Sequence, residues 1–514
     1  LPLQRQLGFH DFVIYEKASE VGGTWRDNIY PGASSDVPVH FYSLSTDLNP
    51  DWPSTHGSQK ETHEYWRKLT AKYQLYPRIT FNREVVSAEW NPKEEQYHIV
   101  TKDVGSGETF TTTAKILISA LGLLEMPRFP DIPGIASFKG EVFHSARWDT
   151  GVDLRGKRVA VIGNGASATQ FVPIISEDAS VQVTNFCRTP NWFLPPIRSD
   201  YSAIWKWTFR HVPGVMRAYR LLMAFRSEVL YMSVFANKAV RNWTTPLAKD
   251  YITETAPKED LDRLIPTYSL GCKRLIFDTG YLPALHRPNL NMNWDGIQSI
   301  CEDGIIAKTG EKLEFDVIIF ATGFTADTYP LRVVGDSGKT VQQYYDTQGG
   351  PKAYMGTTVP GFPNLFMLAG PNTTTGHTSV IWTEEIQINY ILQFIKPILS
   401  GLVSSFAVTT SATDAYNTLI HERLARSVFV DCVSWYRTGG EGKVSSIFPG
   451  PMALYASWLR KPRWGDYIVE SGAGGKDTEK RWKSKVRWER FFELINPGYY
   501  LSVLAGFLVL CVSG

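Results

Sequence analysis

Runs of consecutive apolar residues mark the most clearly predicted strands of the chain. KRVAVIG, which begins at Lys157, and DVIIFATGF, from Asp316 to Phe324, are apolar without alternation, as is typical of strands buried on both faces of a parallel sheet. KILISALG (Lys115 to Gly122) reads as a parallel partner for the second run, and DFVIYEK (Asp11 to Lys17) predicts another strand that closes with Glu16. Buried strands followed by helices predict an α/β fold.

A glycine-rich turn directly follows the strand that begins at Lys157. Gly163 permits a tight turn, Gly165 lets the backbone approach a pyrophosphate, and Ala168 allows close packing between the strand and the helix ASATQFVPII. The N-terminus of that helix faces the phosphate charge. The strand and helix around the turn GNGASA, Gly163 to Ala168, predict a dinucleotide-binding unit.

The ends of two further strands predict which nucleotides bind. VQVTNFCRT places Arg188 and Thr189 where an NAD-selecting enzyme would have a carboxylate, so a cation there would meet the 2′-phosphate of NADP. A solvated arginine at a strand end is the alternative. Glu16 matches the acidic residue that accepts hydrogen bonds from a ribose, although the glycine turn that precedes such a strand would lie before Leu1. An ordinary buried strand is the alternative to this interpretation of Glu16. Because the sequence starts at Leu1 without Met, we interpret the chain as N-terminally truncated. The acidic signal in the first unit and the basic signal in the second together predict a flavoprotein reduced by NADPH.

Composition excludes several other classes. The 514 residues, 43% of them hydrophobic, suffice for two or three domains, and 53 basic against 51 acidic residues give no reason to expect a nucleic-acid partner. The five cysteines form no CxxC pair, which predicts a reducing compartment and argues against a metal site or dithiol chemistry; they are Cys187, Cys272, Cys301, Cys432 and Cys511.

Two regions carry unusual aromatic and basic patterns. Residues from Tyr201 to about Arg263 show apolar and aromatic residues at helical spacing with basic residues between them, which predicts a helical insertion. Its aromatic stripe is interpreted as core in preference to membrane contact. The uncharged C-terminal run Tyr499 to Val512 would reach about 21 Å as a helix, short of a bilayer core of about 30 Å. We expect a cytoplasmic protein, with interfacial anchoring by this tail and a gene-model artefact as open alternatives.

The stretch FKGEVFHSARWD, Phe138 to Asp149, carries a specific resemblance. It fits the FxGxxxHxxxW(P/D) fingerprint of the Baeyer–Villiger monooxygenases, a branch of the flavin-containing monooxygenases, through Phe138, Gly140, His144, Trp148 and Asp149. Other segments resemble the same family in the same order, from about Asp11 to Trp464; they include GGTWRDNIYPGASSDVP, CRTPNW, LGCKR (Leu270 to Arg274) and GPNTTTGH.

The resemblance implies roles for individual residues. It implies that the flavin site is lined by Glu16, Thr24, Trp25, Arg26, Asp27, Asp36, Val37 and Tyr42, and that Ser34, Ser35 and Asp36 also touch the nicotinamide. It further implies that Lys273 joins Arg188 and Thr189 on the 2′-phosphate. The residues that the resemblance places on the NADP pyrophosphate are Gly163, Asn164, Gly165, Ala166, Ser167, Ala168 and Thr169. Arg274 matches the arginine that stabilises the oxygenated flavin, with Asp36 beside it, and these two are the predicted catalytic residues. A permanently charged guanidinium suits that role because it is a poor proton donor.

The predicted function is an FAD- and NADPH-dependent monooxygenase that converts a ketone to an ester or lactone, with a specialised metabolite as the expected substrate type. The alternatives are a nitrogen- or sulfur-oxygenating flavin monooxygenase and a non-catalytic remnant; a disulfide reductase would need a redox cysteine pair. The fingerprint is expected to anchor a linker, with His144 fixing a loop in preference to transferring a proton.

The predicted architecture has two Rossmann-like domains, the NADP domain inserted in the FAD domain, plus a helical insertion. The expected segments are 1–140 and 361–490 for the FAD domain, 150–200 and 266–360 for the NADP domain, 201–265 for the insertion and 491–514 for the hydrophobic tail.

Overall fold

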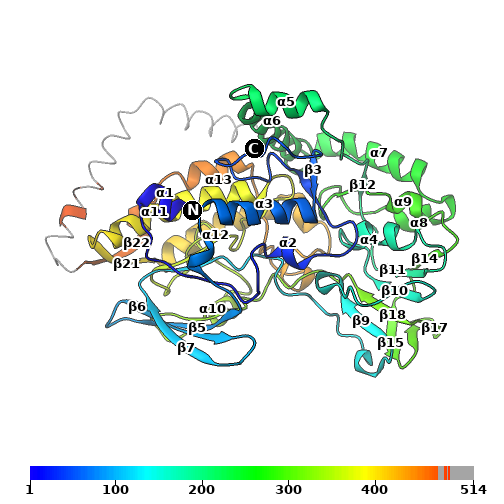
Figure 1. Cartoon of the computed structure of the whole chain (residues 1–514), viewed down its shortest axis with the longest axis horizontal. Coiled ribbons are helices and arrows are strands. Elements are labelled where there is room, and N and C mark those ends of the chain that lie inside the picture. Colours follow the sequence, from blue (N-terminus) through cyan, green and yellow to red (C-terminus); the bar gives the residue numbers. More distant parts are fainter. Residues whose placement is uncertain (473–479, 483, 485, 487–514) are drawn as a thin grey trace.

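The computed structural model describes residues 1–472, 480–482, 484 and 486, so the predicted tail 491–514 lies outside the described residues. The described chain builds two sheet-based units with helices packed around them (Figure 1). The second unit is inserted into the first, as predicted. The segment expected for the NADP domain, 266–360, is not confined to the second unit, because residues 332–334 form a strand in a sheet of the first unit.

A five-stranded parallel sheet forms the centre of the second unit, on the right in Figure 1. Its strands, in spatial order, are β14 (Leu290–Asn293), β11 (Gln182–Phe186), β10 (Arg158–Ile162), β18 (Val317–Phe320) and β9 (Glu141–His144). The central strands β10 and β18 are the two predicted apolar runs, and they lie parallel with Val159 opposite Val317. Both are buried almost throughout because the sheet is covered on both faces.

Different elements cover the two faces of this sheet. Helix α4 (Ala168–Ile175) and the short helix α9 (Tyr281–Ala284) pack together on one side. On the other side, the side chains of Ile300, Ile305 and Phe315 join those of β10 and β18 in one apolar cluster. Ile300 and Ile305 belong to an antiparallel sheet of β15 (Ile297–Cys301), β16 (Gly304–Ala307) and β17 (Lys312–Glu314). Phe315 lies between β17 and β18.

The first unit contains two separate parallel pairs and one larger sheet. The pairs are β1 (Ile14–Tyr15) with β4 (Ile79–Thr80), and β8 (Leu117–Ser119) with β20 (Leu365–Met367). The larger sheet has the order β19 (Arg332–Val334), β5 (Arg83–Asn91), β6 (Gln96–Asp103) and β7 (Thr109–Ala114). The run KILISALG therefore pairs within the first unit, and the expectation that it pairs with DVIIFATGF is wrong. An apolar run identifies a buried strand but not its partner.

Helices of the first unit cluster on the left of Figure 1. Helix α3 begins with a capping box in which Ser58 and Glu61 satisfy each other's backbone donors. The helices are α1 (Pro2–Leu7), α2 (Thr24–Asp27), α3 (Gln59–Lys72), α10 (Val341–Thr347), α11 (Val380–Leu399), α12 (Thr410–Ala425) and α13 (Met452–Trp458). Three short strand pairs complete the unit and its border: β2 (Ser34–Pro38) with β3 (His56–Ser58), β12 (Phe193–Leu194) with β13 (Ile276–Phe277), and β21 (Val403–Val408) with β22 (Tyr467–Ser471).

The predicted insertion is helical in the structure. It consists of α5 (Ala203–His211), α6 (Val215–Leu230), a π-helical turn η4 (Tyr231–Ala236), α7 (Lys238–Thr255) and α8 (Leu261–Leu264). Helices α5 and α6 form the upper edge of the molecule in Figure 1, and α7 runs along the second unit.

Candidate functional site between the two units

An arginine–carboxylate pair joins the two units. Arg274 lies just before β13, and Asp36 lies in β2. The guanidinium makes a two-pronged contact, with Nε 2.9 Å from Oδ2 and Nη2 2.5 Å from Oδ1 of Asp36. The charge of Asp36 raises the pKa of Arg274 above its ordinary value, so the cation is permanent. The side chains are 40% and 28% exposed, which leaves one side of the pair open to a ligand.

Two tyrosines stand near this pair. Burial raises the pKa of both Tyr42 and Tyr436 to about 12, so both phenols are neutral at physiological pH. Tyr42 accepts a hydrogen bond from Trp25 Nε1 at 3.2 Å, and the two predicted flavin-site residues pack edge to face. Tyr436 was not predicted. It lies far from Asp36 and Arg274 in sequence, and no spacing rule connects it to them.

The predicted glycine-rich turn has the expected shape. Gly163 adopts a φ of +110°, and a Cβ there would stand 2.5 Å from the carbonyl oxygen of Ala321, so this position requires glycine. A Cβ on Gly165 would meet nothing within 4 Å, so the space in front of the turn is open to a ligand. Ala168 is fully buried, as expected for close helix–strand packing. Asn164 donates to the carbonyl of Thr189 at 3.0 Å and ties the turn to the end of β11.

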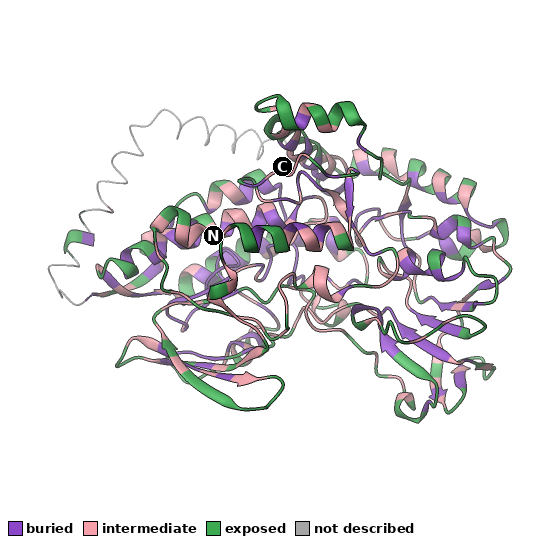
Figure 2. Ribbon diagram, viewed as in Figure 1, coloured by how far each residue is buried: buried purple, intermediate pink, exposed green. Residues whose placement is uncertain are grey.

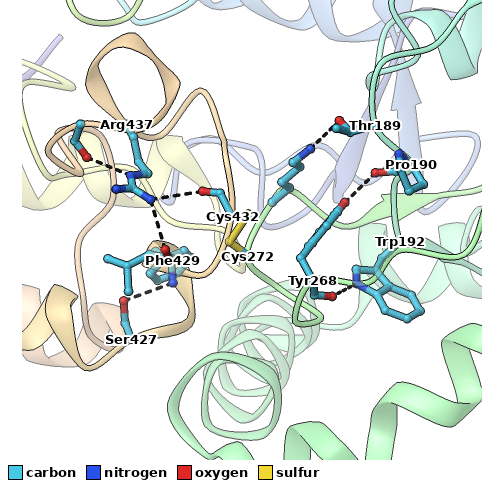
Figure 3. The surroundings of a disulfide bond; sticks show 12 residues. Thr189, Pro190, Trp192, Tyr268, Cys272, Ser427, Phe429, Cys432 and Arg437 are labelled. Carbon is cyan, nitrogen blue, oxygen red and sulfur yellow. Dashed lines mark hydrogen bonds between the residues drawn. A yellow bond between two sulfur atoms is a disulfide. The ribbon is translucent and has the colours of Figure 1, made fainter. Parts of the chain in front are cut away.

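The three residues predicted for the 2′-phosphate gather beside this turn. Lys273 Nζ donates to Thr189 Oγ1 at 2.7 Å and stands 4.9 Å from the ring centre of Tyr268 (Figure 3). Burial, followed by the charge of Arg188, lowers the pKa of Lys273 to about 8. Two cations held this close, one of them exposed, form a site suited to a dianionic phosphate.

Residues predicted for the flavin line the facing edge of the first unit. Glu16 follows β1, accepts a hydrogen bond from the amide of Ala18 at 2.9 Å, and pairs with Arg26 at 3.1 Å. Arg26 in turn holds Asp27, so helix α2 is fixed against the strand end. Ser34, Ser35, Asp36 and Val37 lie together in β2.

A contact across the units fixes β2 against α4. Gln170 donates from Nε2 to the carbonyl of Ser34 at 3.1 Å and accepts from the hydroxyl of Tyr30 at 2.9 Å. These hydrogen bonds therefore fix the position of Asp36 relative to the glycine-rich turn. Gln170 is the first residue after the predicted phosphate-binding segment, and its role was not predicted.

His144 is built as a structural residue. It ends β9, is 1% exposed, and its Nδ1 accepts a hydrogen bond from the amide of Ala146 at 3.1 Å. Burial and the charge of Arg147 lower its pKa to about 4, so the imidazole is neutral. These contacts support the prediction that it fixes a loop.

Two cysteines distant in sequence form a disulfide. Cys272 and Cys432 are bonded across a separation of 160 residues, next to the Lys273–Thr189 contact (Figure 3). The expectation of reduced, unpaired thiols is wrong for this pair, because short-range spacing carries no information about contacts at this separation. Cys187 and Cys301 are free.

This arrangement, with two dinucleotide-type units and a charged pair at their border, defines a nucleotide-dependent flavoprotein. Residues 11–343 match the family model "Flavin-binding monooxygenase-like", and the chain belongs to this family.

Named relatives cover almost the whole chain. A Baeyer-Villiger monooxygenase of Streptomyces coelicolor is 35% identical over 471 residues, covering 90% of this chain and 89% of the relative. A Baeyer-Villiger monooxygenase of Pseudomonas aeruginosa is 38% identical over 453 residues, covering 87% and 84%. The crystal structure of cyclohexanone monooxygenase from Rhodococcus sp. Phi1 bound to NADP+ aligns with a TM-score of 0.78 at 25% identity, covering 90% of this chain and 94% of that chain.

Proposed function

We propose that the protein is an FAD- and NADPH-dependent monooxygenase that inserts one oxygen atom of O2 next to the carbonyl of a small-molecule ketone. The product would be an ester or lactone. The observation that carries this proposal is the adjacency of two charged contacts: Lys273 donates to Thr189 of the second unit, and the next residue, Arg274, is paired with Asp36 of the first. The names of the two bacterial relatives support the type of reaction.

The described residues fit both cofactors. The open turn at Gly165 and the cations Arg188 and Lys273 fit the pyrophosphate and 2′-phosphate of NADPH. Glu16, helix α2, β2 and Tyr42 would hold the flavin from the first unit. When bound, NADPH supplies a hydride and the flavin supplies the oxygen-transfer chemistry.

The protein's own contribution is charge and position. Arg274 places a permanent cation at the border of the units, and because Asp36 raises its pKa it does not deliver a proton there. Asp36 fixes the plane of the guanidinium through both oxygens and offsets the cost of its partial burial. The neutral phenols of Tyr42 and Tyr436 add no competing charge.

The deciding experiment follows NADPH consumption, hydrogen peroxide and ester together. Arg274→Ala should still bind flavin and consume NADPH, but ester formed per NADPH should fall about a hundredfold and hydrogen peroxide should rise to match. Arg274→Lys should recover little because an ammonium cannot make the same two-pronged contact. Arg155→Ala, at an exposed arginine bonded to Asp153, is the matched control. A normal ester yield in Arg274→Ala would contradict the proposal.

The Cys272–Cys432 bond does not revive the disulfide-reductase alternative, since the chain belongs to a monooxygenase family. Nitrogen or sulfur oxygenation is tested in the same assay by replacing the ketone with an amine or a thioether. Product from those substrates, with none from ketones, would instead support a nitrogen- or sulfur-oxygenating flavin monooxygenase.

A membrane contact through the C-terminal run Tyr499 to Val512 is a separate part of this proposal. Among the described residues, no helix has the length and apolar character needed to cross a bilayer. Protein ending at residue 486 should pellet with membranes less than the full chain, and equal pelleting would contradict an anchoring role for the tail.

A further inference from the structure

The helical insertion presents large apolar side chains to solvent. On α6, Leu221, Leu222, Phe225 and Val229 are 69%, 49%, 66% and 47% exposed, and their spacing places them on one face of the helix. The opposite face, with Met223 and Ser227, is buried. Helix α6 therefore carries an apolar stripe on the side that nothing covers among the described residues. The neighbouring helices also expose large apolar side chains, which are Ile204 and Trp207 on α5 and Trp243 and Leu247 on α7. Figure 2 shows this outer edge as exposed.

Basic residues greatly outnumber acidic residues in this region. Between Ala203 and Lys249 there is one acidic residue, Glu228, and the basic residues are Lys206, Arg210, Arg217, Arg220, Arg226, Lys238, Arg241 and Lys249. Arg220 and Arg241 are buried and Arg210 pairs with Asp51, so the other five supply the positive charge of the face. Glu228 points inward, where it accepts a hydrogen bond from the amide of Met452 at 3.0 Å. Arg217 and Arg226 are exposed and flank the apolar stripe. The whole chain has a net charge of only +2, so this excess of positive charge is local.

We infer that this outer face, formed by α5, α6 and the first turns of α7, docks on an anionic lipid surface. Aromatic and aliphatic side chains flanked by arginine and lysine match the acyl and headgroup layers of such a surface. A second copy of the chain fits less well, because a two-fold contact would bring the same arginines together. The expectation that the aromatic stripe is core is wrong for these side chains, which lie outside it.

The test uses the full chain and vesicles of phosphatidylcholine alone or with about a third of phosphatidylserine. The protein should sediment with the anionic vesicles, and Leu221→Ser/Phe225→Ser should weaken the partition about tenfold or more. Arg217→Glu/Arg226→Glu should weaken binding to anionic vesicles more than to neutral ones. The control, Val104→Ser/Ile468→Ser, alters apolar residues that are 52% and 54% exposed outside the insertion.

Circular dichroism and light scattering accompany each variant. Every variant retains the C-terminal tail, so a difference in sedimentation between variants reports on the insertion alone. Equal sedimentation of Leu221→Ser/Phe225→Ser and the parent would overturn the inference. If the parent forms a dimer in solution and Leu221→Ser/Phe225→Ser does not, the outer face binds a second copy of the chain and the lipid inference is overturned.

A second inference rests on the disulfide and on the proposed function. Cys272 directly precedes Lys273 and Arg274, and Cys432 begins the segment that carries Tyr436. Arg437 donates to the carbonyls of Val430 at 3.1 Å and Cys432 at 3.4 Å, so this segment is held as a compact loop (Figure 3). Tyr436 is 2% exposed, and its phenol is close enough for the charge of Arg274 to affect its pKa. The disulfide thus links this loop covalently to the segment that carries Lys273 and Arg274, the two proposed cofactor contacts.

We propose that Cys272 and Cys432 are redox-sensitive positioning residues for Lys273 and Arg274. Cys272 is fully buried and Cys432 half-buried, so an external dithiol would attack the sulfur of Cys432. The sulfur–sulfur bond breaks, Cys272 leaves as a thiolate and takes a proton, and the second thiol of the reagent then displaces Cys432 as a thiol. The reagent supplies two electrons and becomes a disulfide itself. Release of the loop should loosen the segment that carries Lys273.

The experiment measures thiols and nucleotide binding, without turnover. Maleimide labelling and peptide mapping of the unreduced protein should find Cys301 labelled and Cys272 and Cys432 unlabelled, and dithiothreitol should expose both. Reduction should weaken NADP+ binding about tenfold, with little change for NAD+. Cys272→Ala/Cys432→Ala should reproduce the reduced protein, and Cys301→Ala is the control.

The outcomes separate the two hypotheses. Free thiols at Cys272 and Cys432 before reduction, or equal NADP+ affinity in both redox states, would overturn the positioning role. Absence of NADP+ binding in the oxidised protein would instead contradict the proposed function.

Discussion

Lys273 and Arg274 are neighbours in the chain, yet they contact opposite units. Lys273 donates to Thr189, three residues after the end of β11, whereas Arg274 donates to Asp36 in β2. The pKa values of the two side chains are also shifted in opposite directions. Burial makes the lysine easier to deprotonate, while a carboxylate holds the arginine charged. One residue is therefore sensitive to pH and its neighbour is not, which allows nucleotide binding and oxygen transfer to be separated by experiment.

The clamp predicts a selective loss of NADP affinity. Arg188→Ala should weaken NADP+ binding by about 1.5–3 kcal/mol, because it removes a charge-assisted contact to the 2′-phosphate, and should leave NAD+ binding almost unchanged. Titration with both nucleotides measures the difference, with Arg155→Ala as the control. Equal losses for the two nucleotides would show that Arg188 does not read the phosphate.

The pKa of Lys273 predicts a pH dependence. The side chain carries its charge below a pH of about 8 and loses it above, so NADP+ affinity should be highest below that value. Above it, the dissociation constant should rise by up to about tenfold per pH unit, as linkage requires for one proton. The break should be absent for NAD+ and in Lys273→Arg. It should move to higher pH in Arg188→Ala, because the charge of Arg188 helps to lower this pKa. A flat profile for NADP+ between pH 7 and 9.5 would contradict the assignment.

At the scale of elements, the fingerprint segment is explained mainly by packing. It forms β9, the edge strand of the parallel sheet, where Phe143 lies opposite Ile319. Trp148 then packs against Phe143 and against Phe171 of α4. The prediction of an anchored linker captured this role only in part, because the hydrophobic pattern of four residues does not reveal that they join a sheet.

Gly140 tests this packing. A Cβ at this position would stand 2.4 Å from the carbonyl oxygen of Asp316, which precedes β18, so Gly140→Ala should force β9 away from its partner. We expect a loss of about 1–3 kcal/mol in the stability of the second unit, measured from the urea midpoint. Gly465→Ala, where a Cβ would meet nothing within 4 Å, is the control. Equal midpoints for the two variants would show that the strand tolerates the methyl group.

The elements also show what could be predicted from sequence. The strand–turn–helix from β10 to α4 is contiguous, so its local pattern was enough to predict its structure and to propose its phosphate-binding role. Asp36 and Arg274 are separated by most of the second unit, and only the family resemblance brought them together before the structure did. Tyr436, Gln170 and the Cys272–Cys432 bond depend on contacts between distant segments, which no local pattern encodes.

At the scale of the whole molecule, one buried arginine connects the insertion to the first unit. Arg220 on α6 is 8% exposed and donates from Nη1 to the carbonyls of His40 at 2.8 Å and Ser43 at 2.6 Å. Its Nη2 pairs with Glu385 of α11 at 3.0 Å. Tyr42, a predicted flavin contact, lies within the segment that Arg220 holds. The insertion therefore holds the segment that carries Tyr42 as well as presenting the outer face of α6.

Replacing this arginine should affect stability and flavin retention together. Arg220→Met removes the cation beside Glu385, whose Oε1 keeps the amide of Ser45 at 2.7 Å, and it removes the donor to the carbonyls of residues 40, 41 and 43. Breaking such a buried ion pair from one side should cost about 3–5 kcal/mol. The urea midpoint should fall, and flavin should be released at lower urea than in the parent because Tyr42 loses its support. Arg217→Met, at an exposed position one turn earlier on α6, should change stability by less than about 0.5 kcal/mol. Arg220→Met/Glu385→Leu should recover part of the loss, since the uncompensated carboxylate is gone. If Arg220→Met unfolds and releases flavin at the same urea concentrations as Arg217→Met, the insertion does not support the flavin site.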